Sequence, residues 1–422
     1  MMPAEAGAWR QFETAVQRVM DLYGYQEIRL PVIEATELFK RSVGEHTDIV
    51  EKEMFTFLDR EKLSLSLRPE ATASCVRAGI EHGLLHNQQQ RLWYRGPMFR
   101  HERPQAGRFR QFHQVGVEAF GMAGPDIDIE VIALSARILR ELGLLAGADL
   151  QLELNSLGSP QARAGYRAAL VAFLQRHEAA LDADSQRRLQ SNPLRVLDSK
   201  EPATRELLAQ APSLPEYLDA ESKAHLQAVQ EGLNAIGIGF VLNPRIVRGL
   251  DYYNRTVFEW TTARLGAQGT VCAGGRYDGL VAQLGGGEVP AVGFAMGVER
   301  VLQLRKAIAG APAADEAAGA PHAYFCWQGE GSHLAALRLA EGLRNPQPAG
   351  PLRVLLHAGG GKLAGQLKRA DKSGARFALI LGEQELAQQR VQIKPLRAQG
   401  AQLEVAWQDL PAKLAAALDR ES

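Results

Sequence analysis

The stretch 309–321 constrains the fold of this chain more than any other feature. It consists of Ala, Gly and Pro apart from Asp315 and Glu316. Such a composition offers no side chains to pack and favours an extended linker. It therefore predicts that the 422 residues form an N-terminal domain over 1–308 and a smaller C-terminal domain over 322–422. The length agrees, because it exceeds that of one ordinary domain.

The composition narrows the class of protein. Apolar residues make up 46% and charged residues 23%, which is typical of a globular rather than a disordered chain. The formal net charge is zero, so any nucleic-acid surface must be a local patch. The three cysteines are far apart and have neither zinc-site spacing nor a disulfide pattern. No secretory signal or apolar run of the roughly 20 residues that span a bilayer is found, and we expect a soluble, cytoplasmic protein without a membrane segment.

Periodic patterns predict the elements of the larger domain. Apolar residues at helical spacing favour helices at 8–23, 126–142 and 297–308, and residues 25–30 are typical of a strand that ends at Pro31. Strand signals return over 241–297. Between about 160 and 240 the chain is rich in Ala, Leu, Gln and charged residues, which favours a helical insertion.

Residues 91–120 predict an antiparallel hairpin that turns at 104–107. Because alternate side chains of a strand share a face, Arg100 and Glu102 should point one way, and Gln114, Gly116 and Glu118 should line one face of the returning strand. A half-buried sheet whose polar face meets water would give the same alternation. However, segment 91–110 holds six arginines and one acid, and such crowding favours a bound anion such as phosphate.

The C-terminal domain is expected to be a small α/β domain. Strand patterns at 323–327, 353–357 and 376–381 alternate with helical patterns at 332–343, 361–372 and 410–418. From 362 to 397 there are eight Lys or Arg and three acids, a local charge of 8 − 3 = +5. A basic stretch of this kind suits phosphate binding, although a solvated helix face has the same composition.

Three segments resemble the signatures of class II aminoacyl-tRNA synthetases. Residues 24–31 (GYQEIRLP) resemble the first, and Phe99–Glu102 with Arg108 and Phe112 resemble the second. Residues 293–300 (GFAMGVER) resemble the third. Each signature alone is degenerate, but three in order with compatible spacing are specific.

Two further strings resemble the histidyl-tRNA synthetase family, namely 248–253 (RGLDYY) and 274–279 (GGRYDG). The resemblance extends over nearly the whole chain. It implies an α+β catalytic domain with an antiparallel sheet, a helical insertion, and a C-terminal α/β anticodon-binding domain. The implied activity is ATP-dependent activation of L-histidine to histidyl-adenylate and its transfer to the 3′ end of tRNA(His). The first signature normally forms a two-fold interface in this class, so a homodimer is expected.

The resemblance also implies an ATP site. Three arginines would be catalytic: Arg100 at the α-phosphate, Arg300 at the γ-phosphate, and Arg248 between the α-phosphate and the histidine carboxylate. Glu102 would accept from the adenine amino group, Arg108 would seat the triphosphate, and Phe112 would stack on the adenine. Mg²⁺ would arrive with ATP, held mainly by phosphates, and no tightly bound metal site of the protein is expected.

A second implied site binds histidine. Its α-amino group would contact Glu70, Thr72 and Gln114, and its ring nitrogens would contact Glu118 and Tyr253, with Tyr252 and Tyr277 completing the pocket. A carboxylate at one ring nitrogen either fixes the tautomer or favours the charged ring. Buried polar groups can reject substrates that cannot pair with them by roughly 10⁴–10⁵, so no editing domain is required.

Two departures from the family pattern carry expectations. Members usually have a short N-terminal segment before the first helix that contains Gly and Asp, whereas this chain opens MMPAE. Either the start is misplaced or the segment is lost, and in the second case we expect altered packing near the active site. Ala71 stands where glycine is usual. If that position requires a positive φ, alanine strains the loop and weakens histidine binding.

Two other functions are compatible with parts of the sequence. A non-catalytic paralogue, such as the regulatory subunit of ATP phosphoribosyltransferase, would bind histidine and charge nothing. Such proteins tend to lack the C-terminal domain and the catalytic arginines, which are present here. A generic nucleotide-binding or RNA-binding module would explain the basic patches but not the two tyrosine-containing strings.

Overall fold

A computed structural model describes most of the chain. The chain divides into two compact units: one is Phe12–Gly310, and the other is Met1–Gln11 together with Ala311–Ser422. The described residues are 2–44, 47–102, 108–145, 149–199, 201–246, 250, 252–309, 320–346, 350–398 and 400–420. Among them, no helix is long and apolar enough to cross a membrane.

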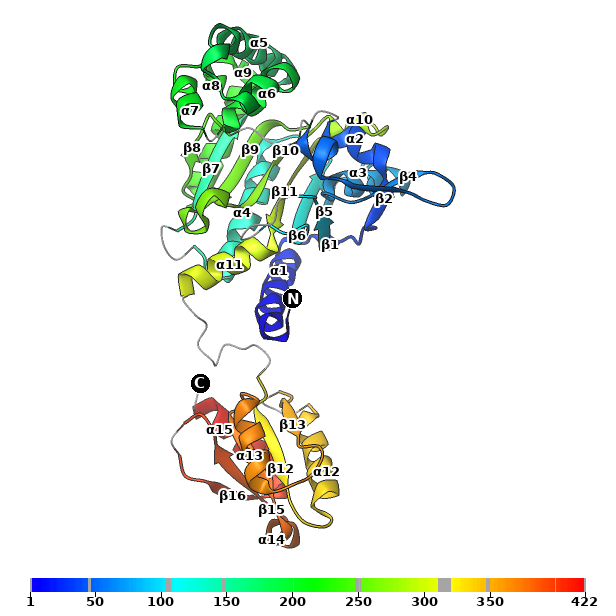
Figure 1. The fold of residues 1–422 in the computed structure, drawn as a ribbon, viewed down its shortest axis with the longest axis vertical. Coiled ribbons are helices and arrows are strands. Elements are labelled where there is room, and N and C mark those ends of the chain that lie inside the picture. The colour runs from blue at the N-terminus through cyan, green and yellow to red at the C-terminus, as the bar shows by residue number, and fades with distance from the viewer. Residues whose placement is uncertain are drawn as a thin grey trace. The chain divides into compact units, whose positions relative to one another are not determined.

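The larger unit is built on an eight-stranded sheet (Figure 1). In order across the sheet its strands are β1 (Gln26–Glu27), β5 (Gln90–Phe99), β6 (Gln111–Phe120), β11 (Ala291–Gly297), β10 (Thr270–Arg276), β9 (Asn254–Thr261), β7 (Gln151–Ser156) and β8 (Val241–Leu242). Neighbours from β5 to β7 pair antiparallel, whereas β1 and β8 add parallel edges. The sheet is therefore mixed, with the expected antiparallel centre.

The hairpin of β5 and β6 confirms the pairing predicted for 91–120, and its register sets Gly116 beside Tyr94 and Leu92 beside Glu118. The proposed turn at 104–107 lies outside the described residues. The expectation that Arg100 and Glu102 share a strand face is wrong, because β5 ends at Phe99 and both follow it. The predicted strand 25–30 shrinks to Gln26–Glu27, since only these two residues pair with β5.

Helices and a small sheet complete the larger unit. The three predicted helices are found as α1 (Pro3–Tyr23), which belongs to this unit from Phe12 onward, α4 (Pro125–Glu141) and α11 (Val298–Ala309). A three-stranded sheet in the order β2-β4-β3 was not predicted. The remaining elements of this region are β2 (Ile33–Ala35), α2 (Thr36–Val43), a π-helix (Ile49–Glu53), β3 (Phe55–Leu58), β4 (Ser64–Leu67), α3 (Thr72–Glu81) and α10 (Leu280–Gln283).

The helical insertion is confirmed, and its helices gather at one end of the large sheet (Figure 1). They are α5 (Pro160–Arg176), α6 (Ala183–Ser191), α7 (Pro202–Leu208), α8 (Leu214–Tyr217) and α9 (Ala220–Ala235), with 3₁₀ turns at Glu178–Ala180 and Pro193–Asp198. Tyr166, Leu170 and Leu174 of α5 are buried in one core cluster with Tyr94, Tyr252 and Tyr277 of the sheet side. The insertion therefore packs as part of the larger unit.

The C-terminal unit has a five-stranded sheet in the order β13-β12-β14-β15-β16. The three predicted strands are β12 (Ala323–Trp327), β13 (Val354–Leu356) and β14 (Phe377–Leu381), which run parallel. The antiparallel strands β15 (Arg390–Pro395) and β16 (Leu403–Ala406) were missed. The helices are α12 (Ser332–Arg344), α13 (Leu363–Lys372), α14 (Glu383–Ala387) and α15 (Leu410–Arg420).

Candidate active site

The antiparallel centre of the large sheet forms the floor of a cavity of about 800 Å³. The cavity wall includes twelve of the thirteen predicted site residues: Glu70, Thr72, Arg100, Glu102, Arg108, Phe112, Gln114, Glu118, Tyr252, Tyr253, Tyr277 and Arg300. Arg248 lies outside the described residues. Of these twelve, Phe112, Gln114 and Glu118 lie on β6, Thr72 on α3 and Arg300 on α11, and the other seven lie in segments that connect helices and strands.

Glu118 on β6 is the centre of one half of the cavity. It is buried and accepts three hydroxyl hydrogen bonds, from Thr72 at 2.8 Å, Tyr94 at 2.9 Å and Tyr277. Thr72 and Tyr94 bind Oε1, and Tyr277 binds Oε2. Burial raises the pKa of Glu118 to about 7, although the three hydroxyl hydrogen bonds lower it. Glu118 is therefore a buried carboxyl group held by three neutral hydroxyl donors.

Two glycines make room for this carboxylate. A Cβ at Gly293 on β11 would lie 2.0 Å from Glu118 Oε2, and a Cβ at Gly116 would lie 2.2 Å from the Tyr94 ring. Both contacts are far inside van der Waals distance. The positions of Glu118 and Tyr94 therefore require glycine on the neighbouring sheet positions.

The next group along the cavity consists of Glu70 and Gln114. Glu70 is buried and accepts from the backbone N–H groups of Thr72 (2.6 Å) and Ala73 (3.1 Å), which fixes the start of α3. Burial raises the pKa of Glu70, and these backbone hydrogen bonds oppose the rise. The Gln114 Oε1 atom is buried and has no partner among the described residues. An unpaired buried acceptor in a cavity suits an incoming N–H donor.

The loop that precedes α3 corrects one expectation. Ala71 has φ −126° and ψ −1°, so the backbone there does not require glycine. The prediction of backbone strain at Ala71 is therefore wrong. The expectation of weakened histidine binding rested on this strain and loses its physical basis.

Tyrosine rings form one wall of the same half. The rings of Tyr252 and Tyr253 are 4.7 Å apart, and those of Tyr252 and Tyr277 are 5.5 Å apart. All three residues are buried. We call them the tyrosine wall.

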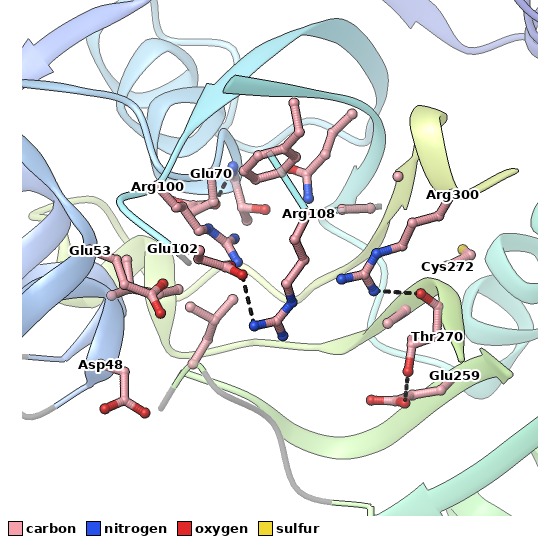
Figure 2. Close-up of a pocket in the computed structure, with 18 of the residues that line it drawn as sticks. Asp48, Glu53, Glu70, Arg100, Glu102, Arg108, Glu259, Thr270, Cys272 and Arg300 are labelled. Atoms are coloured by element: carbon pink, nitrogen blue, oxygen red, sulfur yellow. Dashed lines mark hydrogen bonds and ion pairs between the residues drawn. The ribbon is translucent and has the colours of Figure 1, made fainter. Parts of the chain in front are cut away.

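Arginines dominate the other half of the cavity, where Arg108 and Arg300 extend into the same space (Figure 2). Arg300 donates to the Thr270 carbonyl at 2.7 Å, and Arg108 forms an ion pair with Glu102 at 2.8 Å. Arg100 donates to the Pro69 carbonyl at 2.8 Å, and its guanidinium lies 5.3 Å from the Phe112 ring centroid. Burial lowers the pKa of Arg300, and the positive charge of Arg108 lowers it further. Such a group of cations favours an anionic ligand.

The structure adds lining residues that sequence reasoning missed. Tyr94 is the most informative, since it binds Glu118 directly. Its place on the strand opposite Gly116 was readable from the hairpin register, but a buried tyrosine in a strand carries no functional signal by itself. Glu259 on β9, which accepts from Thr270 Oγ1 at 2.9 Å, also faces the cavity (Figure 2). The helical insertion contributes Asp182, Asp184, Arg188, Arg195, Ser199 and Glu201 to the cavity wall.

Metal binding by side chains alone has no support in the described ranges, where no cluster of three or more His, Cys, Asp or Glu could hold an ion. Single carboxylates do line the arginine half, for example Glu259. One such group suits a Mg²⁺ ion that keeps most of its ligands from phosphates and water.

This architecture defines a class. An antiparallel sheet with arginines from a central hairpin and from the helix after the last strand, all facing one cavity, is the catalytic fold of class II aminoacyl-tRNA synthetases. A family sequence model described as histidyl-tRNA synthetase matches residues 1–301, and one described as anticodon binding domain matches residues 328–417. The chain belongs to the histidyl-tRNA synthetase family.

Solved structures agree with this assignment. Apo histidyl-tRNA synthetase from S. aureus is 33% identical, with 98% of this chain and 97% of that chain covered and a TM-score of 0.79. Histidyl-tRNA synthetase from Nostoc sp. PCC 7120 is 20% identical over 99% and 97%, with a TM-score of 0.71. An ATP phosphoribosyltransferase regulatory subunit/histidyl-tRNA synthetase from Bacillus halodurans C is 21% identical over 88% and 93%, with a TM-score of 0.61. The last two show the shared fold alone.

Proposed function

We propose that the chain activates L-histidine with ATP to histidyl-adenylate and transfers the histidyl group to the 3′ end of tRNA(His). The observation that carries the proposal is the division of one cavity into a half with a buried carboxylate and a half with converging arginines. The first half suits an imidazole ring, and the second suits a triphosphate. Family membership connects the two halves in one reaction.

Histidine would bind with its ring at Glu118 and the tyrosine wall. The Glu118 carboxylate has about four lone-pair positions, of which the described hydroxyls fill three. The remaining position on Oε2 would accept one N–H of the ring, and Tyr253 would contact the other ring nitrogen. The α-amino group would donate to Gln114 Oε1. Glu70 and Thr72 would support it, although in the ligand-free protein both already bind neighbouring groups.

ATP would bind in the arginine half. Arg100 would contact the α-phosphate, Arg300 the γ-phosphate and Arg108 the triphosphate. Because Arg108 is paired with Glu102, adenine binding to Glu102 would compete with this ion pair. Likewise, Phe112 would exchange its contact with the Arg100 guanidinium for the adenine ring. Arg248 is assigned the position between the α-phosphate and the histidine carboxylate.

The chemistry needs no general base in its first step, since the histidine carboxylate is itself the nucleophile. It attacks the α-phosphorus, and pyrophosphate leaves with the electron pair of the broken P–O bond. Fixed arginines at the developing charge stabilise this transition state and align the reactants. Mg²⁺, held by the phosphates and one carboxylate such as Glu259, would neutralise charge on the triphosphate.

The remaining assignments follow the family. We assign catalysis to 1–308 with the insertion at about 160–240, a linker to 309–321, and anticodon binding to 322–422. The basic stretch 362–397 supports tRNA binding, since Lys362, Lys368, Arg369, Lys372, Lys394 and Arg397 are exposed. The proposed form is a cytoplasmic homodimer.

Histidine-dependent exchange of labelled pyrophosphate into ATP tests the first step, with the other amino acids as controls. Exchange with histidine only, followed by charging of a tRNA(His) transcript, is the expected result. Histidine binding without exchange would instead support the regulatory paralogue. That alternative is the weaker one, because Arg100 and Arg300 both line the cavity and the C-terminal unit is present.

A further inference from the structure

The helical insertion contacts the rear of the histidine half at three places. Arg163 Nη1 on α5 donates to the Tyr253 carbonyl at 2.6 Å. Glu221 on α9 accepts from Arg255 at 2.6 Å. His225, also on α9, lies 3.3 Å from Asp128 of α4. The first two contacts reach the segment that carries Tyr253, and the third reaches Asp128, which pairs with Arg276 beside Tyr277.

The first two contacts join the insertion to Tyr253 and Arg255, in the segment that carries Tyr252 and Tyr253. This segment precedes β9, so the backbone of Tyr253 is not part of the regular strand ladder. Arg255 follows it with a φ of 47°, a left-handed conformation that L side chains rarely adopt. Its backbone is fixed to the start of the insertion, because Arg255 N–H donates to Gly158 O at 3.0 Å and Arg255 O accepts from Leu157 N–H at 2.7 Å. The segment therefore contacts both the insertion, through Arg163 and Glu221, and the two residues that lead into it.

The third contact leads to Tyr277. Asp128 is fully buried and forms an ion pair with Arg276, the residue before Tyr277. Arg276 is also fully buried and binds Asp278 at 3.1 Å and the Gly124 carbonyl at 2.9 Å. A guanidinium with this many charged and carbonyl partners has one orientation. The residue next to Tyr277 is therefore anchored in a buried cluster that His225 of α9 approaches.

We propose that the helical insertion positions the tyrosine wall and that Arg163 is a positioning residue for histidine binding. The proposal rests on the proposed function for its ligand, and it goes further by giving the insertion a role in substrate specificity. A hydrogen bond from a charged donor to the Tyr253 carbonyl restrains the backbone that carries the ring. Removal of this bond would let the Tyr253 ring leave the geometry needed by the imidazole, whereas the arginine half would be unaffected.

The test compares Arg163→Met with wild type by calorimetric titration of histidine, with the Michaelis constant for ATP measured by pyrophosphate exchange. We expect the histidine Kd to rise about 10-fold, or about 1.4 kcal/mol, while the ATP constant changes less than about twofold. Arg163→Lys keeps a charged donor but not the planar fork, and should give an intermediate Kd. Arg167→Met is the matched control, because Arg167 is exposed one turn further along α5, and it should bind histidine as wild type does.

Thermal unfolding of each variant distinguishes a loss of positioning at Tyr253 from a loss of global stability. Equal losses of histidine and ATP binding, or a histidine Kd for Arg163→Met within about twofold of wild type, would overturn the proposal. If Arg163→Met does not fold, the Lys variant decides, since an unchanged Kd there also overturns it. Wild-type protein that binds histidine without exchange refutes the proposed catalysis and leaves the binding comparison valid. Wild-type protein that binds no histidine refutes both.

Discussion

The two halves of the cavity differ in the partners that their charged side chains have in the ligand-free protein. In the histidine half, Glu118 already has three hydroxyl donors around one carboxylate. In the arginine half, Arg300 is half-buried, and the charges of Arg108 and Arg100 lower its pKa. Glu118 is thus surrounded by hydrogen-bond donors of the protein, whereas the group of cations favours an anionic ligand. We infer that the histidine half selects the amino acid, because its geometry is fixed before the ligand binds. The arginine half increases the reaction rate, because its cations interact most strongly with the phosphate charge that develops in the transition state.

The largest expected effect comes from the arginine half. Arg300→Gln should lower kcat for histidine-dependent pyrophosphate exchange by about 1000-fold, because a fixed cation at the transferring phosphates is lost. Histidine binding measured without ATP should not change. Lys306→Gln on the exposed face of α11 is the control and should retain full activity. A loss confined to histidine affinity would contradict the division into two halves.

In the histidine half, Glu118→Gln should lower kcat/KM for histidine by about 100-fold, since a hydrogen bond to a charged acceptor is replaced by a neutral one. Steady-state exchange kinetics would measure this, with the ATP constant as the internal reference. An equal rise in the ATP constant would show that the two halves are not separable.

The pH dependence of the free energy of unfolding tests the histidine half separately from the arginine half. Burial raises the pKa of Glu118 from 4.5 to about 7, so the folded ligand-free protein binds more protons than the unfolded chain between these values. Glu118 therefore contributes to the free energy of unfolding at low pH. This contribution falls by on the order of 3 kcal/mol as the pH rises from 4.5 to about 7. Urea unfolding of wild type and Glu118→Gln at pH 5 and pH 8 should show a smaller loss in the variant. Parallel pH profiles would argue against an elevated pKa.

The smallest expected effect is at Ala71. Because its φ is negative, Ala71→Gly relieves no strain, and the histidine KM should stay within about twofold of wild type. The melting temperature should fall slightly, since glycine adds entropy to the unfolded chain. A markedly lower KM would mean that alanine does disturb the loop of Glu70 and Thr72.

The sequence predicted elements with strong periodicity and missed those defined by pairing. The helix of α1 was expected because Phe12, Val16, Val19 and Met20 repeat at helical spacing, and all four are buried. Strands β15 and β16 were missed because their neighbours, rather than an apolar run of their own, stabilise them. Tyr94, Glu259 and the insertion residues of the cavity were missed for a similar reason, since only the tertiary fold brings them to Glu118 or to the arginines.

The crowding at Glu118 Oε2 has a consequence for modified amino acids. Gly293 lies on one side of this atom, the Tyr277 hydroxyl occupies one of its lone pairs, and only one acceptor position remains for a ring N–H. A histidine methylated on the nitrogen that faces this position has no proton to donate, and its methyl group would replace the hydrogen bond to Oε2 with an apolar contact. The site would therefore bind such a ring poorly. In a cell that contains methylated histidine, this selectivity would exclude it from newly made protein without any proofreading step.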